Sequence, residues 1–173
     1  MRHNKHEEIK ILVENNINVL LSGPAGSGKS TLIQNVCDEL DYELRFISCT
    51  LQMTISHLLG FRSVSGEYIR TQFRDAVEFG YVFMLDEIDS ASQNTLLVLN
   101  SLDNGKVSFP DIVIDVHENF RLVATANTIG NNNHSAYSGR QQLDASTLSR
   151  FDIILIGSET CPMFKLVGES NET

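Results

Sequence analysis

The stretch of sequence that decides the fold reads Gly23-Pro24-Ala25-Gly26-Ser27-Gly28-Lys29-Ser30. Gly-x4-Gly-Lys-Ser is the pattern of a phosphate-binding loop, which joins the end of a strand to the start of a helix. The apolar residues 19–21 come just before it, as expected of a buried strand. Residues 29–40 carry apolar side chains at helical spacing, namely Leu32, Ile33, Val36 and Leu40. Because both flanking elements are those the loop requires, a chance glycine turn is the weaker interpretation.

This loop predicts a nucleoside triphosphate as the ligand. Its glycines allow backbone N–H groups to turn toward the phosphates, and the following helix presents its positive end to the same anion. We expect Lys29 to reach the β- and γ-phosphates and the Ser30 hydroxyl to bind Mg²⁺. The residues expected to contact the nucleotide are Gly23, Pro24, Ala25, Gly26, Ser27, Gly28, Lys29, Ser30 and Thr31.

The rest of the chain predicts an α/β fold in which strands alternate with helices. Apolar runs predict five core strands, at residues 18–22, 44–48, 81–85, 120–126 and 151–156. Helical spacing predicts helices at residues 7–14, 29–40, 55–59, 72–79, 96–102 and 143–150. Such alternation is typical of a parallel five-stranded sheet between two helical layers, the P-loop NTPase sandwich. We expect one domain over residues 1–157, with hairpin insertions near Gly66 and at residues 107–114.

Two acidic residues, Asp86 and Glu87, close the most apolar strand. Functional groups gather at the carboxyl ends of parallel strands, so we expect this pair to face the phosphate loop. Asp86 is suited to holding Mg²⁺, and Glu87 to orienting and deprotonating an attacking water. The alternative is that acids after a strand cap the next helix, a role that Asp89 or Ser90 is also suited to.

Two more polar residues complete the predicted site. Asn127 ends another buried strand, where its amide is able to position the same water or contact the γ-phosphate. Arg150 stands between a short helix and the last strand, where a guanidinium is able to stabilise phosphoryl-transfer charge on a neighbouring subunit. The alternative for Arg150 is a surface ion pair with Asp152. Arg140 is a second, weaker candidate for bridging subunits.

Composition narrows the class of protein. A net charge of −9 over 173 residues argues against broad affinity for nucleic acid. No apolar run approaches the ~20 residues of a membrane span, and the polar start of the chain is unlike a signal peptide. We therefore expect a cytoplasmic protein without a membrane segment. Three widely spaced cysteines, Cys37, Cys49 and Cys161, are expected to be reduced thiols.

Taken in order, these motifs resemble the AAA+ ATPases, in their MoxR/dynein-related branch, and are similar to the small ATPase subunit of cobaltochelatase. The resemblance covers residues 18–156. Its general part is Walker A at residues 23–30, Walker B at residues 82–87 and sensor 1 at residues 125–128. Three further stretches are more diagnostic of this branch, at residues 66–71, 99–105 and 143–151.

The resemblance implies ATP and Mg²⁺ as cofactors and a ring, usually of six subunits, with ATP at each interface. It implies that Arg150 reaches the neighbour's γ-phosphate, that hydrolysis remodels a partner protein, and that both hairpins point toward a pore or that partner. Family members also carry a helical lid after the last strand. Residues 158–173 contain Pro162 and Gly168, so we expect a short tail there and no helical lid domain.

Three other functions remain open from the sequence. A nucleotide-binding subunit or truncated fragment that does not hydrolyse ATP would keep the same phosphate loop. A nucleic-acid motor or loader is disfavoured by the acidic charge. A small-molecule kinase is the weakest alternative, because it does not require a water-activating carboxylate such as Glu87 beside Asp86.

Overall fold

The computed structural model describes residues 5–127 and 143–157. The predictions for Thr128, Arg140, Cys161 and the tail 158–173, with its expected lack of a lid, fall outside these residues. The division into a core of residues 1–157 and a tail therefore stays a prediction.

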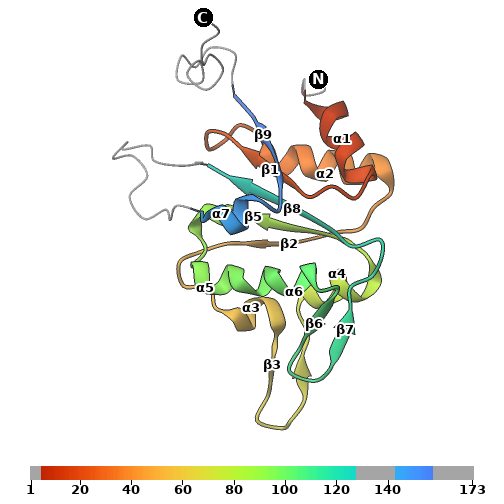
Figure 1. The fold of residues 1–173 in the computed structure, drawn as a ribbon, viewed down its shortest axis with the longest axis vertical. Helices are drawn as coiled ribbons and strands as arrows, with labels where there is room; N and C mark the ends of the chain where they lie inside the picture. Colours follow the sequence, from red (N-terminus) through yellow and green to blue (C-terminus); the bar gives the residue numbers. More distant parts are fainter. Residues whose placement is uncertain (1–4, 128–142, 158–173) are drawn as a thin grey trace, which may run out of the picture.

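The fold is built on one parallel sheet of five strands, as the sequence predicts. The strand order is β2-β5-β8-β1-β9 (Figure 1). Their bounds are β1 Val19–Ser22, β2 Leu44–Ser48, β5 Val82–Asp86, β8 Arg121–Ala126 and β9 Asp152–Leu155. Ser22 lies opposite both Ala126 and Leu155, and Ser48 lies opposite Asp86. This register brings the carboxyl ends of the strands to one edge of the sheet, where the phosphate loop begins.

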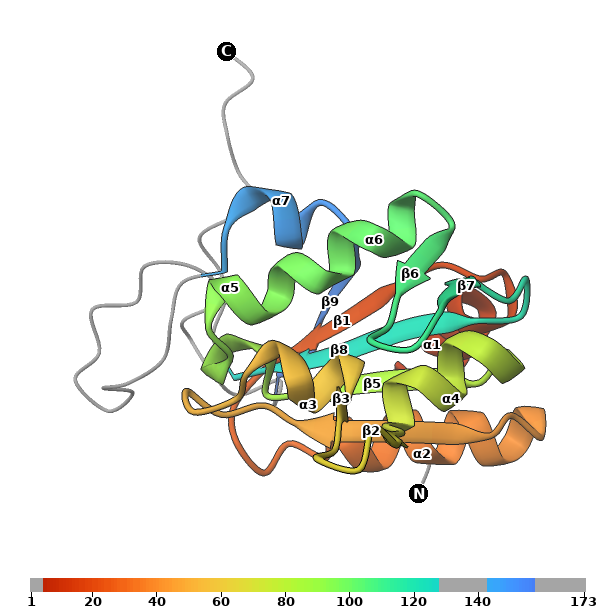
Figure 2. The ribbon, with the colours of Figure 1, turned by 90° about the horizontal axis from the view of Figure 1, so that it is seen from below.

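Helices cover both faces of the sheet (Figures 1 and 2). One face is covered by α1 (His6–Glu14) and α2 (Lys29–Leu40), whose apolar side chains pack on β1, β5 and β8. The other face is covered by α3 (Ile55–Leu59), α4 (Gln72–Phe79), α5 (Gln93–Leu96), η2 (Leu97–Leu99) and α6 (Asn100–Asp103). The centre of this second layer is Phe73, whose ring centroid lies 5.0 Å from that of Phe83. Burying such a side chain stabilises the fold by about 1.5–3 kcal/mol.

The helix predicted at residues 96–102 is longer and less regular than expected. It begins at Gln93 as α5, passes through the 3-10 turn η2 and ends at Asp103 as α6. Ser92 is its N-cap, because its hydroxyl accepts a hydrogen bond from the Thr95 backbone N–H at 3.2 Å. The capping role weighed for Asp89 and Ser90 is therefore wrong, since both lie in the preceding 3-10 turn η1 (Ile88–Ser90).

Both predicted hairpins form, and they project together from the α4 side of the sheet (Figure 1). The first pairs β3 (Phe61–Arg62) with β4 (Tyr68–Ile69), and the second pairs β6 (Lys106–Ser108) with β7 (Val113–Asp115). Arg62 joins them, because its Nε donates to the Pro110 carbonyl oxygen at 3.0 Å.

A buried arginine in α4 fastens the two hairpins to the core. Arg74 is 4% exposed and donates to Asp111 at 2.9 Å and to Glu78 at 3.0 Å. Its guanidinium also lies over the rings of Tyr68 and Phe109. One side chain thus contacts a residue of each hairpin.

No helix among the described residues is long and apolar enough to cross a membrane.

Candidate nucleotide-binding and hydrolysis site

The phosphate loop depends on its glycines for two different reasons. Gly28 has φ +81° and forms the N-cap of α2, a left-handed conformation that other residues rarely adopt. Gly23 instead packs against Ile156, just after β9, where an added Cβ would lie 1.9 Å from the Ile156 carbonyl oxygen. The loop is therefore shaped by a turn at its end and by close packing at its start.

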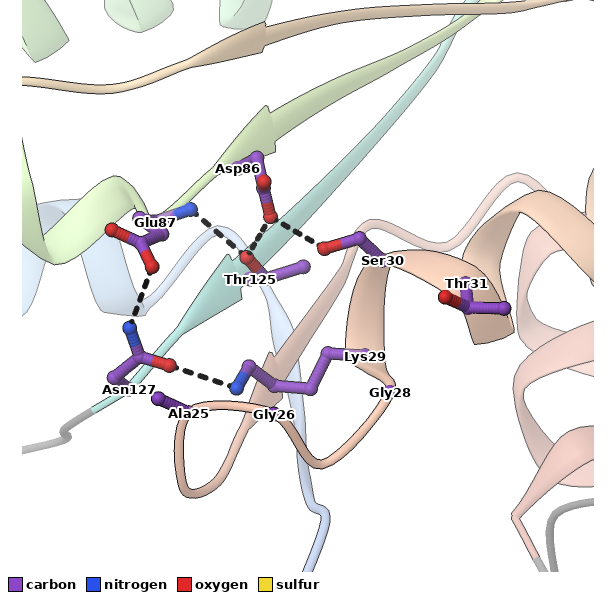
Figure 3. Close-up of a pocket in the computed structure, with 10 residues that line it drawn as sticks. All are labelled: Ala25, Gly26, Gly28, Lys29, Ser30, Thr31, Asp86, Glu87, Thr125 and Asn127. Atoms are coloured by element: carbon purple, nitrogen blue, oxygen red, sulfur yellow. Dashed lines mark hydrogen bonds between the residues drawn. The ribbon is translucent and has the colours of Figure 1, made fainter.

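Lys29 is held inside the loop. Its side chain is buried, and its ammonium group donates to the carbonyl oxygens of Gly23 and Pro24, each at 2.9 Å. It also donates to the Asn127 Oδ1 atom at 2.9 Å, which joins the loop to the end of β8 (Figure 3). The sequence predicts both residues for the site, and the structure brings them into direct contact.

A second set of contacts surrounds Asp86. Its Oδ1 atom accepts hydrogen bonds from the Ser30 hydroxyl at 2.7 Å and from the Thr125 hydroxyl at 2.6 Å (Figure 3). The Thr125 hydroxyl oxygen accepts in turn from the Glu87 backbone N–H at 2.9 Å. Ser30 and Asp86 thus present adjacent hard oxygen donors at a phosphate loop, the chemistry that Mg²⁺ requires. These two residues fit the predicted metal ligands.

Glu87 and Asn127 face each other across the end of the sheet. The Asn127 Nδ2 atom donates to Glu87 Oε1 at 3.0 Å. Glu87 has φ +55°, an uncommon conformation for a residue with a Cβ, which the Thr125 hydrogen bond to its backbone supports. The Asn127 backbone N–H donates to Asp89 at 3.2 Å, so a buried carboxylate behind the site holds the Asn127 main chain.

These groups line a single pocket of about 320 Å³ at the carboxyl edge of the sheet. Of the predicted residues, it is lined by Ala25, Gly26, Gly28, Lys29, Ser30, Thr31, Asp86, Glu87 and Asn127, with Thr125 in addition. Gly23, Pro24 and Ser27 lie in the loop but do not line the pocket. The family resemblance places Thr125 in sensor 1 but gives its side chain no separate role. Alternation along an extended chain puts Thr125, in β8, on the same side as Asn127, which follows the strand.

Arg150 lies away from this pocket. It follows α7 (Ala145–Leu148) and comes just before β9, and its carbonyl oxygen accepts from Asn18 Nδ2 at 3.2 Å. Arg150 comes before the amino end of β9, whereas the phosphate loop follows the carboxyl end of the parallel strand β1. Four strand residues separate these two ends, a length of about 13 Å. The Arg150 side chain pairs with Asp103 and Asn100 of α6. The expected alternative partner, Asp152, is not the residue with which Arg150 pairs.

The parallel sheet and the phosphate loop define the α/β fold of the P-loop nucleoside triphosphatases. The family model for the AAA domain of the dynein-related subfamily matches residues 18–151. The chain therefore belongs to this family, and the predicted AAA+ fold and branch are confirmed. The family and fold support ATP binding and hydrolysis in general. The narrower likeness to the cobaltochelatase subunit stays a prediction.

Several relatives of this chain come from staphylococci. An uncharacterised protein of Staphylococcus saprophyticus is 26% identical over 157 residues, which cover 84% of this chain and 57% of that protein. An uncharacterised protein of Staphylococcus epidermidis is 25% identical over 160 residues, covering 86% of this chain and 58% of that protein. The chain thus spans somewhat more than half the length of these relatives.

Solved structures share the fold at low identity. A candidate ATPase from Cytophaga hutchinsonii superposes with a TM-score of 0.63 at 18% identity, covering 87% of this chain and 44% of that one. NtrX from Brucella abortus in complex with ADP superposes with a TM-score of 0.64 at 15% identity, covering 90% of this chain and 35% of that one. These similarities show that proteins of very different sequence share the fold of this chain.

Proposed function

We propose that this chain binds ATP with Mg²⁺ and hydrolyses it as one subunit of an oligomeric AAA+ ATPase. The observation that carries the proposal is the connected set of side chains from Lys29 through Asn127 to Glu87, beside Ser30 and Asp86. It joins a phosphate-binding group, a metal-binding pair and a candidate base in one pocket. The ADP complex of the structurally similar NtrX supports a nucleotide as the ligand.

When the nucleotide binds, Lys29 exchanges hydrogen-bond acceptors. The ammonium group now donates to two loop carbonyls and to Asn127, and we propose that β- and γ-phosphate oxygens replace some of these acceptors. The phosphates also accept from backbone N–H groups at the start of α2, where the helix dipole favours an anion. Ser30 and Asp86 would hold Mg²⁺, which supplies charge neutralisation at the phosphates.

Hydrolysis then depends on Glu87 and Asn127. Glu87 orients the attacking water and accepts its proton, as a carboxylate within hydrogen-bond reach is able to do. Asn127 holds Glu87 at 3.0 Å before the nucleotide arrives, and it is placed to contact the γ-phosphate or the same water afterwards. A kinase has no use for such a base directed at water.

We further propose that the active form is a ring in which Arg150 serves the neighbouring subunit. Arg150 lies at the amino end of β9, whereas its own phosphate loop lies at the carboxyl ends, so it is badly placed for its own nucleotide. Remodelling of a partner protein in the cytoplasm, through the two projecting hairpins, completes the proposal and rests on the family resemblance.

The test of hydrolysis is Glu87→Gln. Phosphate release should fall by about 10²- to 10⁴-fold, the usual contribution of a general base. Affinity for a fluorescent ATP analogue with Mg²⁺ should be retained, because glutamine has nearly the same shape and volume as the glutamate it replaces. Glu118→Gln, at an exposed glutamate remote from the pocket, is the control. Turnover that survives Glu87→Gln contradicts the assigned base, and wild-type binding without any turnover favours the non-hydrolysing alternative.

A further inference from the structure

The guanidinium of Arg150 is fixed by three groups of one short segment, residues 99–103. Its Nη2 atom donates to Asn100 Oδ1 at 2.6 Å, and its Nη1 atom donates to the Leu99 carbonyl oxygen at 3.4 Å. Nη1 also forms an ion pair with Asp103. The Arg150 side chain is only 15% exposed as a result, whereas that of Asp103 is 60% exposed. This segment belongs to the 99–105 motif, for which the proposed function has no role.

The local structure explains why these partners converge. Asn100 and Asp103 stand three residues apart in α6, so their side chains lie on the same face of the helix. Arg150 reaches that face from the junction of α7 and β9, and its main-chain carbonyl is held separately by Asn18. Both the backbone and the far end of the side chain are therefore fixed. A free arginine would lose rotamer entropy on being ordered at a ligand, whereas the Arg150 side chain is already ordered.

The contacts leave part of the guanidinium available. Arginine has five N–H donors in a rigid planar fork. Among the described residues, the three contacts of Arg150 use Nη1 and Nη2 and none uses Nε. A phosphate oxygen approaching from outside is thus able to bind the same fork without displacing all of its partners. Asn100 and Asp103 therefore orient the guanidinium without using all of its N–H donors.

We infer that Asn100 and Asp103 are positioning residues that hold Arg150 in the orientation needed at the nucleotide of the neighbouring subunit. The inference rests on the proposed function, because it requires Arg150 to act in trans. On this inference, the 99–105 motif acts in the subunit that supplies the arginine, and not in the subunit whose nucleotide is cleaved. A merely structural tie between α6 and β9 would affect both subunits alike.

The experiment mixes two inactive subunits. An arginine donor carries Glu87→Gln, so its own site is inactive but its Arg150 is intact. An acceptor carries Arg150→Ala, so its own pocket is intact but it offers no arginine. Each alone should hydrolyse ATP slowly, and an equimolar mixture should recover activity at acceptor pockets. The inference is then tested by adding Asp103→Ala to one subunit at a time.

Asp103→Ala on the donor should reduce the recovered activity by about 10- to 100-fold, since small misplacement of a positioned group has effects of this size. The same substitution on the acceptor, whose arginine is already absent, should leave the recovered activity intact, which also shows that the variant folds. Asn100→Ala on the donor should act in the same direction. Asp103→Asn, which keeps an acceptor oxygen, should restore part of the activity. Asp152→Ala on the donor is the control, at the neighbouring exposed carboxylate.

Three results overturn the inference. Equal losses on donor and acceptor show a structural tie, and an increase with the donor variant shows that Asp103 restrains Arg150. No recovery in the unmodified mixture, with an active wild type, shows that Arg150 does not act in trans. Failure of the proposed function itself is distinguishable, because then the wild-type protein releases no phosphate in any mixture.

Discussion

Thr125 is the residue on which the two halves of the candidate site depend. It is fully buried, donates to Asp86 and accepts from the Glu87 backbone N–H. A single hydroxyl thereby sets the position of the carboxylate proposed for Mg²⁺ and supports the left-handed backbone of the proposed base. The proposed metal-binding residue and the proposed base are therefore coupled through this one side chain.

Thr125→Val should separate these effects from simple packing, because valine keeps the shape and removes the hydroxyl. The Glu87 N–H loses its buried acceptor, so we expect the free energy of unfolding in urea to fall by about 1–3 kcal/mol. ATP turnover should fall about 10-fold or more as Glu87 loses its fixed position. Thr95→Val is the matched control, since Thr95 is buried and donates to the Met53 carbonyl oxygen at 2.9 Å, away from the pocket. A similar loss of turnover in that variant would refute the role of Thr125.

At this scale the sequence predicts residue types better than their partners. Lys29, Ser30, Asp86, Glu87 and Asn127 meet in one pocket as expected, because parallel strands place their carboxyl ends together. The contact of Arg150 with Asn100 and Asp103 could not be predicted, because it joins α6 to the junction of α7 and β9, about 50 positions further along the chain. The assigned roles of all these residues stay predictions.

At the scale of elements, Arg74 connects α4 with both hairpins. It lies between Glu78 and Asp111 and stacks on Tyr68 and Phe109. Partial desolvation alone would raise the pKa of Glu78, but hydrogen bonds from Arg70 and Arg74 outweigh it and lower that pKa. The pKa of Asp111 is lowered in the same way, by hydrogen bonds from Arg74 and the backbone that outweigh desolvation.

Arg74→Met should therefore destabilise the fold by about 2 kcal/mol at pH 7. This is less than the roughly 3–5 kcal/mol of a fully buried pair, because both carboxylates remain partly solvated. Both carboxyl pKa values are lowered by folding, so their contribution is present above about pH 4 and is lost as the pH falls through the folded values. The difference between wild type and variant in urea unfolding should thus shrink from about pH 7 to about pH 3.

Arg70→Met provides the comparison for that experiment. Arg70 pairs with the same Glu78 at 2.7 Å, but its side chain is 42% exposed. Exposed ion pairs contribute about 0.2–1 kcal/mol, so this variant should be the milder one. Hydrogen exchange of residues 61–69 and 106–115 should quicken only in the Arg74 variant. Equal effects of the two substitutions would show that burial of Arg74 is unimportant.

Strands and helices differ in how well the sequence locates them. Residues 82–86 form a strand buried on nearly every position, and such a continuous apolar run leaves little choice of element. For the α5–η2–α6 segment the sequence predicts a start at Leu96, where the apolar residues begin to recur, but the Ser92 cap sets the first turn at Gln93. Periodicity reports the buried face of a helix and not its ends.

At the scale of the whole molecule, two buried thiols report on global unfolding. Burial raises the pKa of Cys37 to about 12, and burial together with Asp86 and Asp89 raises the pKa of Cys49 to about 12. The two lie in different layers, on opposite faces of the sheet. Neither thiol should react while the sheet and its helices are in place, since the thiolate is the nucleophile.

A Cys161→Ser variant isolates these two groups. At about pH 8 the raised pKa values keep both buried thiols protonated, so we expect a disulfide reagent to label native protein only at the rate of unfolding. Both thiols should react rapidly in urea, and over the same range of urea concentration. Rapid labelling of one thiol in native protein would show that its layer opens independently.

The strand order β2-β5-β8-β1-β9 marks the limit of sequence reasoning about the whole fold. Alternating strands and helices predict a parallel sheet, but many orders satisfy that pattern. Residue pairs such as Val19 with Val123 lie about a hundred positions apart, and local propensity carries no information about them. The sequence therefore predicts a parallel sheet but not the order of its strands, and the family match confirms the predicted AAA+ fold.

The contact of Gly23 with Ile156 has a consequence for how this sequence is able to evolve. No other residue fits at the first glycine of the phosphate loop, because a Cβ there would lie 1.9 Å from the Ile156 carbonyl oxygen. A descendant that abandoned nucleotide chemistry would still be under selection to keep glycine at this position, while Lys29 drifted freely. An inactive lineage should therefore be recognised by its lost lysine and acids, and the surviving Gly23 would record only the architecture.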